Sequence, residues 1–520
     1  MFVSKRNGWM LFYGMRNCMK KKVTIINNIK RLGRILFVFL IISCNKNYII
    51  ESKTVEYREV VTTLKNQNQS KNANKDSISQ KEALDDIEVL KYLLTTAYAG
   101  YDAACERGLS FDLLNKNLND IFESAENVKI ADFAKLLYMS LSPYIKDSHM
   151  YLSCKEFAAS FMEPKYWYFS DIYVEQQNNK YIVYSSNFED IQKGDILSIN
   201  DENLFLTMKN GAEMYRIGGL SSEIVETIKI ADYLIPVKIA SEKDYARSFL
   251  VYSFETEKTG YLRLANFYAP QTPAEQKMAD KYVECAQKFK NKDFIVLDLR
   301  SCAGGTDEYS FNFFDELYNG KTNKSSLFAL RNSVGGMIDY SSPAIIQSKL
   351  YGYWTDSSDE SEKEMLINYY QNLLDDYKEN PRLEKTVYAS PYKIKQKKPD
   401  YKGVILVLSD KKNASSGEDT IMIGNYLFRN TEQYVIIGTN SYGALSYANV
   451  LEYYLPNSRI FLQLGCSDFT SLKMYKDCHF HGEGIGIIPD YWCSDEDVGD
   501  ILLQLTGDEE LVSKMERILK

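Results

Sequence analysis

The sequence predicts an α/β protein built around a parallel sheet. Three continuous apolar runs, "FIVLDLR" (294–300), "GVILVLS" (403–409) and "YVIIGT" (434–439), are separated by segments with helical periodicity. Apolar runs of this length without alternation are typical of strands that are buried on both faces by helices. Two further runs, "LEYYLP" and "RIFLQLG", predict an antiparallel addition to the sheet. With 520 residues, 45% of them apolar, the chain is long enough for two or three domains.

The first 43 residues predict a secretory signal peptide. They carry nine Lys or Arg and no acidic residue, and they run into the apolar stretch "ILFVFLIISC". A basic segment, a short apolar run and a small residue before a cysteine are typical of a signal and not of a membrane-spanning helix. "IISC" resembles a bacterial lipobox with Cys44 as its lipidated cysteine; an ordinary cleaved signal or a single anchor helix is the alternative. We expect an extracytoplasmic protein, lipid-anchored to a bacterial membrane on its periplasmic face or at the cell surface.

The charge and the cysteines exclude some partners. Removing the nine cations of the signal lowers the formal net charge of −8 by nine, to −17. Such an acidic chain is not expected to bind nucleic acid. Removal of Cys18 with the signal peptide and modification of Cys44 leave seven cysteines without paired spacing. Neither a disulfide framework nor a CxxC zinc site is therefore expected.

Changes of pattern mark the predicted domains in the first half of the chain. Residues 44–78, including "KNQNQSKNANKDS", are polar and predict a disordered tether. Residues 79–165 predict a helical domain, because apolar residues recur at helical spacing after a capping box of Ser79 and Glu82. Residues 166–250 alternate in polarity and predict a small β module. Within it, "IQKGDILSIN" resembles the strand-turn-strand of a PDZ domain, although any β hairpin could carry this pattern.

The second half of the chain is expected to hold the α/β core. The core spans residues 251–500, and a C-terminal helix follows at residues 501–520. Residues 322–392 are rich in tyrosine and charge and predict an irregular insertion, a candidate lid or substrate-facing arm.

The residues able to do acid-base or nucleophilic chemistry are few. The three histidines are His149, in "KDSHMY", and His479 and His481, in "HFHGEGIGIIPD". Ser415 and Ser416 lie between the run "GVILVLS" and the helical pattern "DTIMIGNYLF". A hydroxyl at such a junction lies at the positive end of a helix, where an oxyanion is stabilised. The alternative is that the serine only caps the helix.

Several motifs in one order resemble the tricorn and C-terminal-processing peptidase family of serine peptidases. They are "DSH", "GYLRLANF", "DLRSCAGG" (298–305), "SSGE" and "EGIGIIPD", and the resemblance covers roughly residues 80–495. It implies a ClpP/crotonase-like βαβ core with added antiparallel strands, an acyl-enzyme mechanism and no cofactor. The family patterns D-L-R-x-N-x-G-G and S-A-x-E imply Ser415 as the nucleophile. Cys302 and Ser416 depart from these patterns, which have asparagine and a small apolar residue there.

The resemblance also implies the remaining site residues. In the processing branch of the family a lysine serves as base, but Ala444 stands at its position here. In the tricorn-like branch a histidine takes the serine proton, and a serine and a glutamate orient it. The matching residues are Ser148, His149, Ser415 and Glu483 as the tetrad, and Gly304, Gly305 and Ser416 as the oxyanion hole.

We therefore expect an extracytoplasmic serine endopeptidase that hydrolyses peptides or unfolded proteins through an acyl-enzyme on Ser415. The β module is expected to bind substrate C-termini by strand addition. One alternative is a catalytically inactive lipoprotein that binds peptides or apolar ligands on the same fold. Another is a zinc hydrolase in which His479, His481 and Glu483 share one face of a strand; the peptidase interpretation requires no metal.

Overall fold

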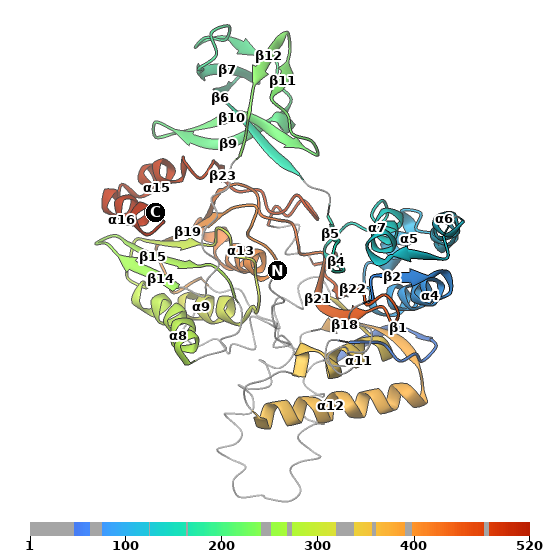
Figure 1. Cartoon of the computed structure of the whole chain (residues 1–520). Coiled ribbons are helices and arrows are strands. Elements are labelled where there is room, and N and C mark those ends of the chain that lie inside the picture. The colour runs from blue at the N-terminus through green and yellow to red at the C-terminus, as the bar shows by residue number, and fades with distance from the viewer. Residues whose placement is uncertain are drawn as a thin grey trace, which may run out of the picture. The chain divides into compact units, whose positions relative to one another are not determined.

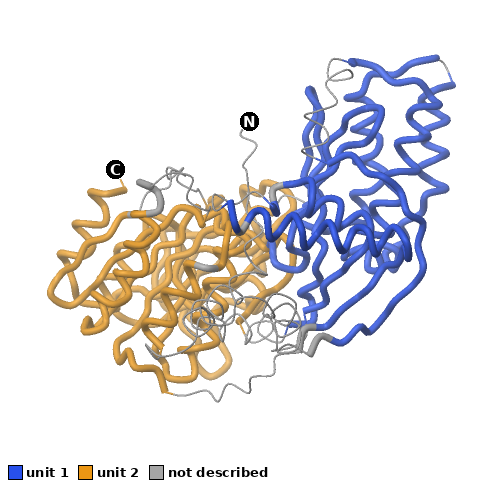
Figure 2. Tube along the Cα trace, turned by 90° about the horizontal axis from the view of Figure 1, so that it is seen from below, with its two compact units in different colours: residues 1–162, 323–395, 444–474 blue, residues 163–322, 396–443, 475–520 orange. Residues whose placement is uncertain are grey.

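The structure, a computed structural model, divides the chain into two compact units (Figures 1 and 2). It describes residues 46–62, 75–123, 125–162, 165–240, 251–267, 273–318, 337–355, 360–389, 398–472 and 478–519. Unit 1 comprises residues 1–162, 323–395 and 444–474, and unit 2 comprises residues 163–322, 396–443 and 475–520. The predicted signal peptide and Cys44 lie outside the described residues, and none of the helices described has the length and apolar character to span a bilayer.

Unit 2 contains the predicted parallel sheet. Its strands, in sheet order, are β14 (Val251–Glu255), β15 (Thr259–Leu264), β16 (Phe294–Asp298), β19 (Val404–Ser409), β20 (Tyr434–Gly438) and β23 (Tyr491–Trp492). From β15 to β23 every neighbouring pair is parallel, and β14 is antiparallel to β15. The three apolar runs thus form β16, β19 and β20, as predicted. Their side chains are buried because helices cover both faces of the sheet.

Five helices in the described part of unit 2 pack on this sheet. They are α8 (Pro273–Lys288), α9 (Glu308–Tyr318), α13 (Ser416–Phe428), followed by the short turn η5 (Arg429–Thr431), and α15 (Val498–Thr506) and α16 (Glu509–Leu519). Side chains of α15 and α16 pack against Val296, Leu406 and Leu408 on one face. The predicted single C-terminal helix is in fact two helices, because Gly507 takes the left-handed conformation (φ 60°) that ends α15.

A second, antiparallel sheet in unit 2 corresponds to the predicted β module (Figure 1). Its strands, in order, are β8 (Ile196–Leu197), β7 (Lys180–Ser185), β6 (Tyr166–Gln177), β10 (Ala212–Ser221) and β9 (Leu204–Lys209), and β13 (Lys238–Ile239) pairs with β6. A hairpin of β11 (Thr227–Ile230) and β12 (Tyr233–Pro236) accompanies it. Between residues 165 and 240, the only helical element is the 3₁₀ turn η3 (Asp201–Asn203). This module has its own apolar cluster, which includes Ile172, Val174 and Ile217.

Unit 1 is built on a third, antiparallel sheet. Its strands, in order, are β1 (Lys46–Thr54), β18 (Arg382–Ala389), β17 (Ile338–Ser341), β22 (Phe461–Asp468), β4 (Asp147–Ser153) and β5 (Ala158–Phe161), and β21 (Tyr447–Tyr454) also pairs with β22. The helices of the unit are α4 (Gln80–Ala97), α5 (Tyr101–Glu106), α6 (Phe111–Phe122), α7 (Ile130–Leu141), α11 (Pro343–Tyr351) and α12 (Glu360–Glu379), with the turn η4 (Tyr353–Thr355). A small ladder of β2 (Ser77–Ser79) and β3 (Asn127–Lys129) precedes α4 and α7.

Local signals of unit 1 are confirmed at the start of α4. Ser79 is the N-cap residue, and Ser79 and Glu82 form the predicted capping box. The helices α4 to α7 do not stand alone, however. Their apolar side chains share one core with β4, β21 and β22. The helices expected as an N-terminal domain therefore belong to a larger unit that includes segments from much later in the chain.

Two expectations of irregular structure are wrong. Residues 46–62 do not form a disordered tether: β1 pairs with β18 at eight positions, and Val60 is buried and donates its N–H to the side chain of Gln347. The polar run at residues 63–74 lies outside the described residues. Most of the 322–392 insertion is also regular, because β17, α11, α12 and β18 complete the sheet and core of unit 1. In both cases long-range strand pairing orders segments that lack a strong local pattern.

Candidate active site

Ser415 occupies a strained turn between β19 and α13. Its backbone has φ 55° and ψ −122°, a combination that residues other than glycine rarely adopt. Conformations of this kind cost about 1–3 kcal/mol and persist where the surrounding structure enforces them, often at functional sites. Ser415 is the N-cap residue of α13, so the expected cap and the expected nucleophile position coincide. Its side chain is half-buried.

The glycine turn after β16 packs directly against Ser415. Gly304 has φ 83°, and a Cβ at this position would lie 2.7 Å from Ala414 O, 2.8 Å from Ser415 Cβ and 2.8 Å from Ser416 N. Only glycine therefore fits here. The hydroxyl of Ser416 donates to Gly305 O at 2.9 Å. The structure thus brings Gly304, Gly305, Ser415 and Ser416 together.

This arrangement is suited to holding a negative charge. The first N–H groups of a helix have no acceptor within the helix, and the Ser416 N–H is the first of α13. Gly304 packs so closely beside it that an added Cβ would lie only 2.8 Å from Ser416 N. Backbone N–H groups fixed next to a nucleophile stabilise an oxyanion, because they need no rearrangement when the charge develops. The geometry therefore supports acyl transfer at Ser415.

A buried ionic network anchors the glycine turn. The carboxylate of Asp298 accepts hydrogen bonds from the Arg300 side chain at 2.7 and 3.0 Å and from Tyr261 Oη at 2.7 Å. It also pairs with Arg263 at 3.0 Å, and Arg300 reaches Asp495 at 3.0 Å. Burial alone would raise the pKa of Asp298, but the charges of Arg300 and Arg263 outweigh it and hold this pKa well below its usual range. The D-L-R part of the motif is therefore structural.

Two carboxylates that the sequence analysis did not single out fix the turns. Asp410 accepts from the N–H of Ser301 at 2.8 Å and from that of Lys412 at 3.0 Å, so it ties the glycine turn to the turn after β19. The sequence signal that could have identified Asp410 is an acidic residue directly after a buried strand. Glu418 is the last residue of "SSGE" and was used only to locate the serine. Its side chain is fully buried in the protein.

Glu418 connects the serine turn to the loop that carries Glu483. One carboxylate oxygen accepts from the Ser415 N–H at 3.1 Å. The other accepts from Ser441 Oγ at 2.5 Å and from the Gly443 N–H at 2.7 Å. Gly443 O in turn accepts from the Gly484 N–H at 3.0 Å. The residue next to Glu483 is thus part of the same hydrogen-bond system as Ser415.

Ser148 and His149 lie on β4 of unit 1. His149 is buried, donates its N–H to Asp147 Oδ1 at 2.8 Å and accepts from Gln463 Nε2 through its carbonyl at 2.8 Å. Ser148 Oγ donates to Met162 Sδ at 3.1 Å. The predicted site residues therefore form two sets. Ser148 and His149 belong to unit 1, and the nucleophile, the oxyanion-hole residues and Glu483 belong to unit 2.

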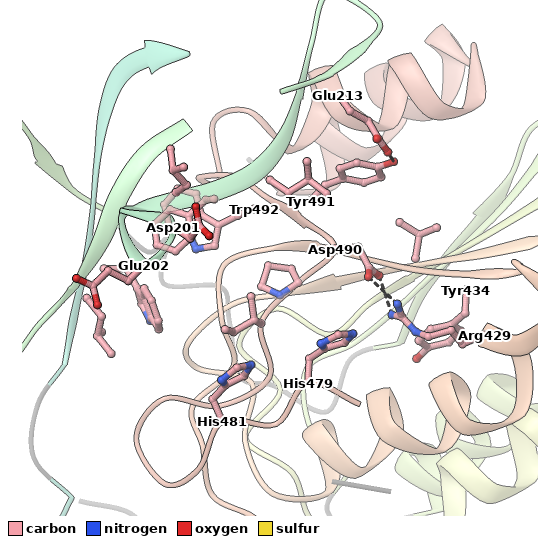
Figure 3. A pocket seen from close by; sticks show the side chains of 18 of the residues that line it. Asp201, Glu202, Glu213, Arg429, Tyr434, His479, His481, Asp490, Tyr491 and Trp492 are labelled. Atoms are coloured by element: carbon pink, nitrogen blue, oxygen red, sulfur yellow. Dashed lines mark hydrogen bonds and ion pairs between the residues drawn. The ribbon is translucent and has the colours of Figure 1, made fainter. Parts of the chain in front are cut away.

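The geometry assumed for a zinc site is wrong. His479, His481 and Glu483 do not lie on a strand: His479 has φ 53°, and the glycines around Glu483 have positive φ and bend the chain. Three His, Cys, Asp or Glu side chains placed to hold a metal ion do not occur within the described ranges. Burial, with a contribution from His479, lowers the pKa of His481. Both histidines instead line a cavity (Figure 3).

Comparisons with known proteins give one family match and several similar solved structures. Residues 258–492 match the model of peptidase family S41. No curated protein matches the chain. Among solved structures, the chain is similar to mature CPAF (12% identity, 84% of this chain and 96% of that one, TM-score 0.38). It is also similar to the photosystem II D1 C-terminal processing protease, with 12% identity over 82% of this chain and 98% of that one and a TM-score of 0.33. The third similar structure is the tricorn protease, with 11% identity over 85% of this chain and 37% of that one and a TM-score of 0.31.

Proposed function

Because this chain contains a region of peptidase family S41 at residues 258–492, we propose that it is a serine endopeptidase that cleaves peptides or unfolded proteins through an acyl-enzyme on Ser415. The observation that carries this proposal is the strained Ser415 turn, packed against Gly304 and next to the first N–H of α13. Strain of this kind is concentrated at functional sites, and here it lies at the residue that the family pattern implies as the nucleophile. The inactive alternative is therefore not favoured.

In the proposed mechanism Ser415 is the nucleophile and His149 transfers the protons. His149 accepts the proton of Ser415 Oγ as the oxygen attacks the scissile carbonyl carbon. The N–H groups of Gly304 and Ser416 stabilise the oxyanion of the tetrahedral intermediate. His149 then donates the proton to the leaving amine, and in the second half-reaction it activates the water that hydrolyses the ester. Ser148 and Glu483 orient the histidine as hydrogen-bond partners.

The proposal includes an extracytoplasmic location, with lipid on Cys44 as the membrane anchor. Its support is the basic and apolar pattern of residues 1–43 and the small residue before the cysteine. Substrate C-termini are proposed to add as a strand to the β module. The support here is β9, which forms an edge of its sheet and pairs only with β10 among the described strands.

Labelling with a fluorophosphonate tests the activated nucleophile. The unlipidated chain from residue 45 is treated with the reagent, and mass spectrometry locates the adduct. We expect an adduct on Ser415 that is lost in Ser415→Ala and slowed at least about 100-fold in His149→Ala. His481→Ala is the matched control, since it removes an imidazole outside the proposed tetrad and should label like the wild type. A well-folded wild type that forms no adduct on Ser415 would contradict the proposal.

A further inference from the structure

Unit 2 contains a cavity of about 860 Å³ (Figure 3). Its lining includes Tyr434 and Val435, at the start of β20. The hydrogen-bond system of Ser415 instead contacts Ser441 and Gly443, which follow the end of this strand. At about 3.3 Å per residue, the five residues of β20 separate the two places by roughly 13 Å or more. The cavity nevertheless extends toward the loop of Glu483, since Ile488 in its lining follows Ile487, whose N–H donates to Ser441 Oγ at 2.7 Å.

Aromatic side chains form one wall of the cavity. Trp492 and Phe205 are stacked with ring centroids 4.5 Å apart, and Trp167 meets Phe205 edge-on at 5.8 Å. The wall continues along β9, whose residues 204–206 all line the cavity. The cavity therefore offers an apolar wall to an extended peptide.

The rim of the cavity is strongly acidic. Its charged residues are Asp201, Glu202, Glu213, Glu432, Asp490 and Arg429. The guanidinium of Arg429 makes a bidentate ion pair with Asp490 at 2.7 and 2.8 Å, so these two charges cancel. Within the part of the chain described, the other four carboxylates have no Lys or Arg partner; Asp201 and Glu213 only accept from tyrosine hydroxyls at 2.6 Å. The lining therefore favours a cationic ligand.

The aromatic wall and the acidic residues together suggest the chemistry of the ligand. Cationic heads on apolar stems are combined in the side chains of Lys and Arg. Peptides that contain these residues therefore match both features of the lining.

We propose that this cavity binds a basic peptide segment of the protein substrate. The stems of Lys or Arg side chains pack on the aromatic wall, where the rings also attract the cations. The cationic heads face Asp201, Glu202 and Glu432. The substrate role rests on the proposed peptidase function and gives the enzyme a preference for chains with a basic segment some distance from the cleaved bond. His479 and His481 line this cavity and precede Glu483 on the same loop.

Peptide binding to the Ser415→Ala chain from residue 45 tests this inference without cleavage of the probe. The probes are blocked hexapeptides of alternating leucine and lysine, with matched leucine-glutamate and serine-lysine peptides, and calorimetry gives each Kd. We expect the leucine-lysine peptide to bind about tenfold more tightly than either control peptide. Glu202→Gln/Glu432→Gln should weaken its binding about 3- to 30-fold. Both residues are exposed, so these substitutions leave the core intact.

The matched control is Glu226→Gln/Glu284→Gln, which removes the same charge from exposed positions outside the cavity. We expect its Kd to stay within about twofold of the parent chain. Equal affinity for the glutamate peptide, equal weakening by the control pair, or no weakening by the cavity pair would each overturn the inference. Because the probe is measured without the nucleophile, absence of binding refutes only the cavity, and absence of fluorophosphonate labelling refutes only the peptidase.

Discussion

Replacing Gly304 by alanine adds a single methyl group to the glycine turn beside Ser415. The added Cβ would lie 2.7 Å from Ala414 O and 2.8 Å from Ser416 N, and both are backbone atoms that yield only if the serine turn moves. The residue must also keep φ 83°, which costs a non-glycine residue about 1–2 kcal/mol. Overpacking adds about 1–3 kcal/mol. We therefore expect Gly304→Ala to lower the free energy of unfolding by about 3 kcal/mol.

The effect of Gly304→Ala on catalysis should exceed its effect on folding. Displacing one oxyanion donor costs about 10²–10³-fold in kcat, so labelling and peptide hydrolysis should fall by at least about 100-fold in the folded variant. Denaturant unfolding and the rate of fluorophosphonate labelling measure the two effects separately.

The control for this prediction is Gly194→Ala. Gly194 also has a positive φ, 97°, but an added Cβ would meet nothing within 4 Å. It should lose about 1–2 kcal/mol of stability to backbone strain and keep its labelling rate. A Gly304→Ala chain that is folded and labels within about threefold of the wild type would refute the assignment of this turn to the oxyanion hole.

Three further predictions follow from the contacts around the site and from β1. Glu418→Gln leaves fewer acceptor oxygens for the donors of Ser415, Ser441 and Gly443. It should therefore slow the labelling of Ser415 about 10- to 100-fold, while the cavity still binds its peptide. Unchanged labelling would show that the carboxylate does not position the serine. A chain that begins at residue 80 lacks β1 and the buried Val60. Its free energy of unfolding in urea should be at least about 3 kcal/mol lower than that of the chain from residue 45. Equal urea midpoints for the two chains would mean that the β1–β18 pairing contributes nothing to stability. The depressed pKa of Asp298 means that its stabilising contribution is complete above its unfolded pKa of about 3.9 and is lost as the pH falls from that value toward the much lower folded pKa. Asp298→Asn should therefore lower stability by about 3 kcal/mol at neutral pH and flatten the decline of the unfolding free energy below about pH 4; parallel wild-type and variant pH curves would contradict this.

Local patterns in the sequence predicted the parts of the structure that depend on neighbouring residues. The apolar runs became β16, β19 and β20, since a strand buried on both faces needs such a run wherever it occurs. Ser79 and Glu82 form their capping box within one helical turn. The glycine of "DLRSCAGG" and the serine of "SSGE" meet because the strands before them, β16 and β19, are parallel neighbours whose ends lie at one edge of the sheet.

Only the tertiary structure decided features that depend on distant partners. β1 is ordered because β18, more than 300 residues later, offers it a free sheet edge, and nothing in "KNYIIESKT" itself identifies that partner. The carboxylate of Glu418 gains its role from Ser441 and Gly443, which the fold brings back to it. Likewise the alternation of "HFHGE" predicted a strand, but positive φ angles turn it into a loop. The sequence by itself thus determined the buried strands, the helix cap and the reactive residue types. The pairing of remote segments determined which segments are ordered and which side chains act together, because such pairing depends on contacts that no local pattern encodes.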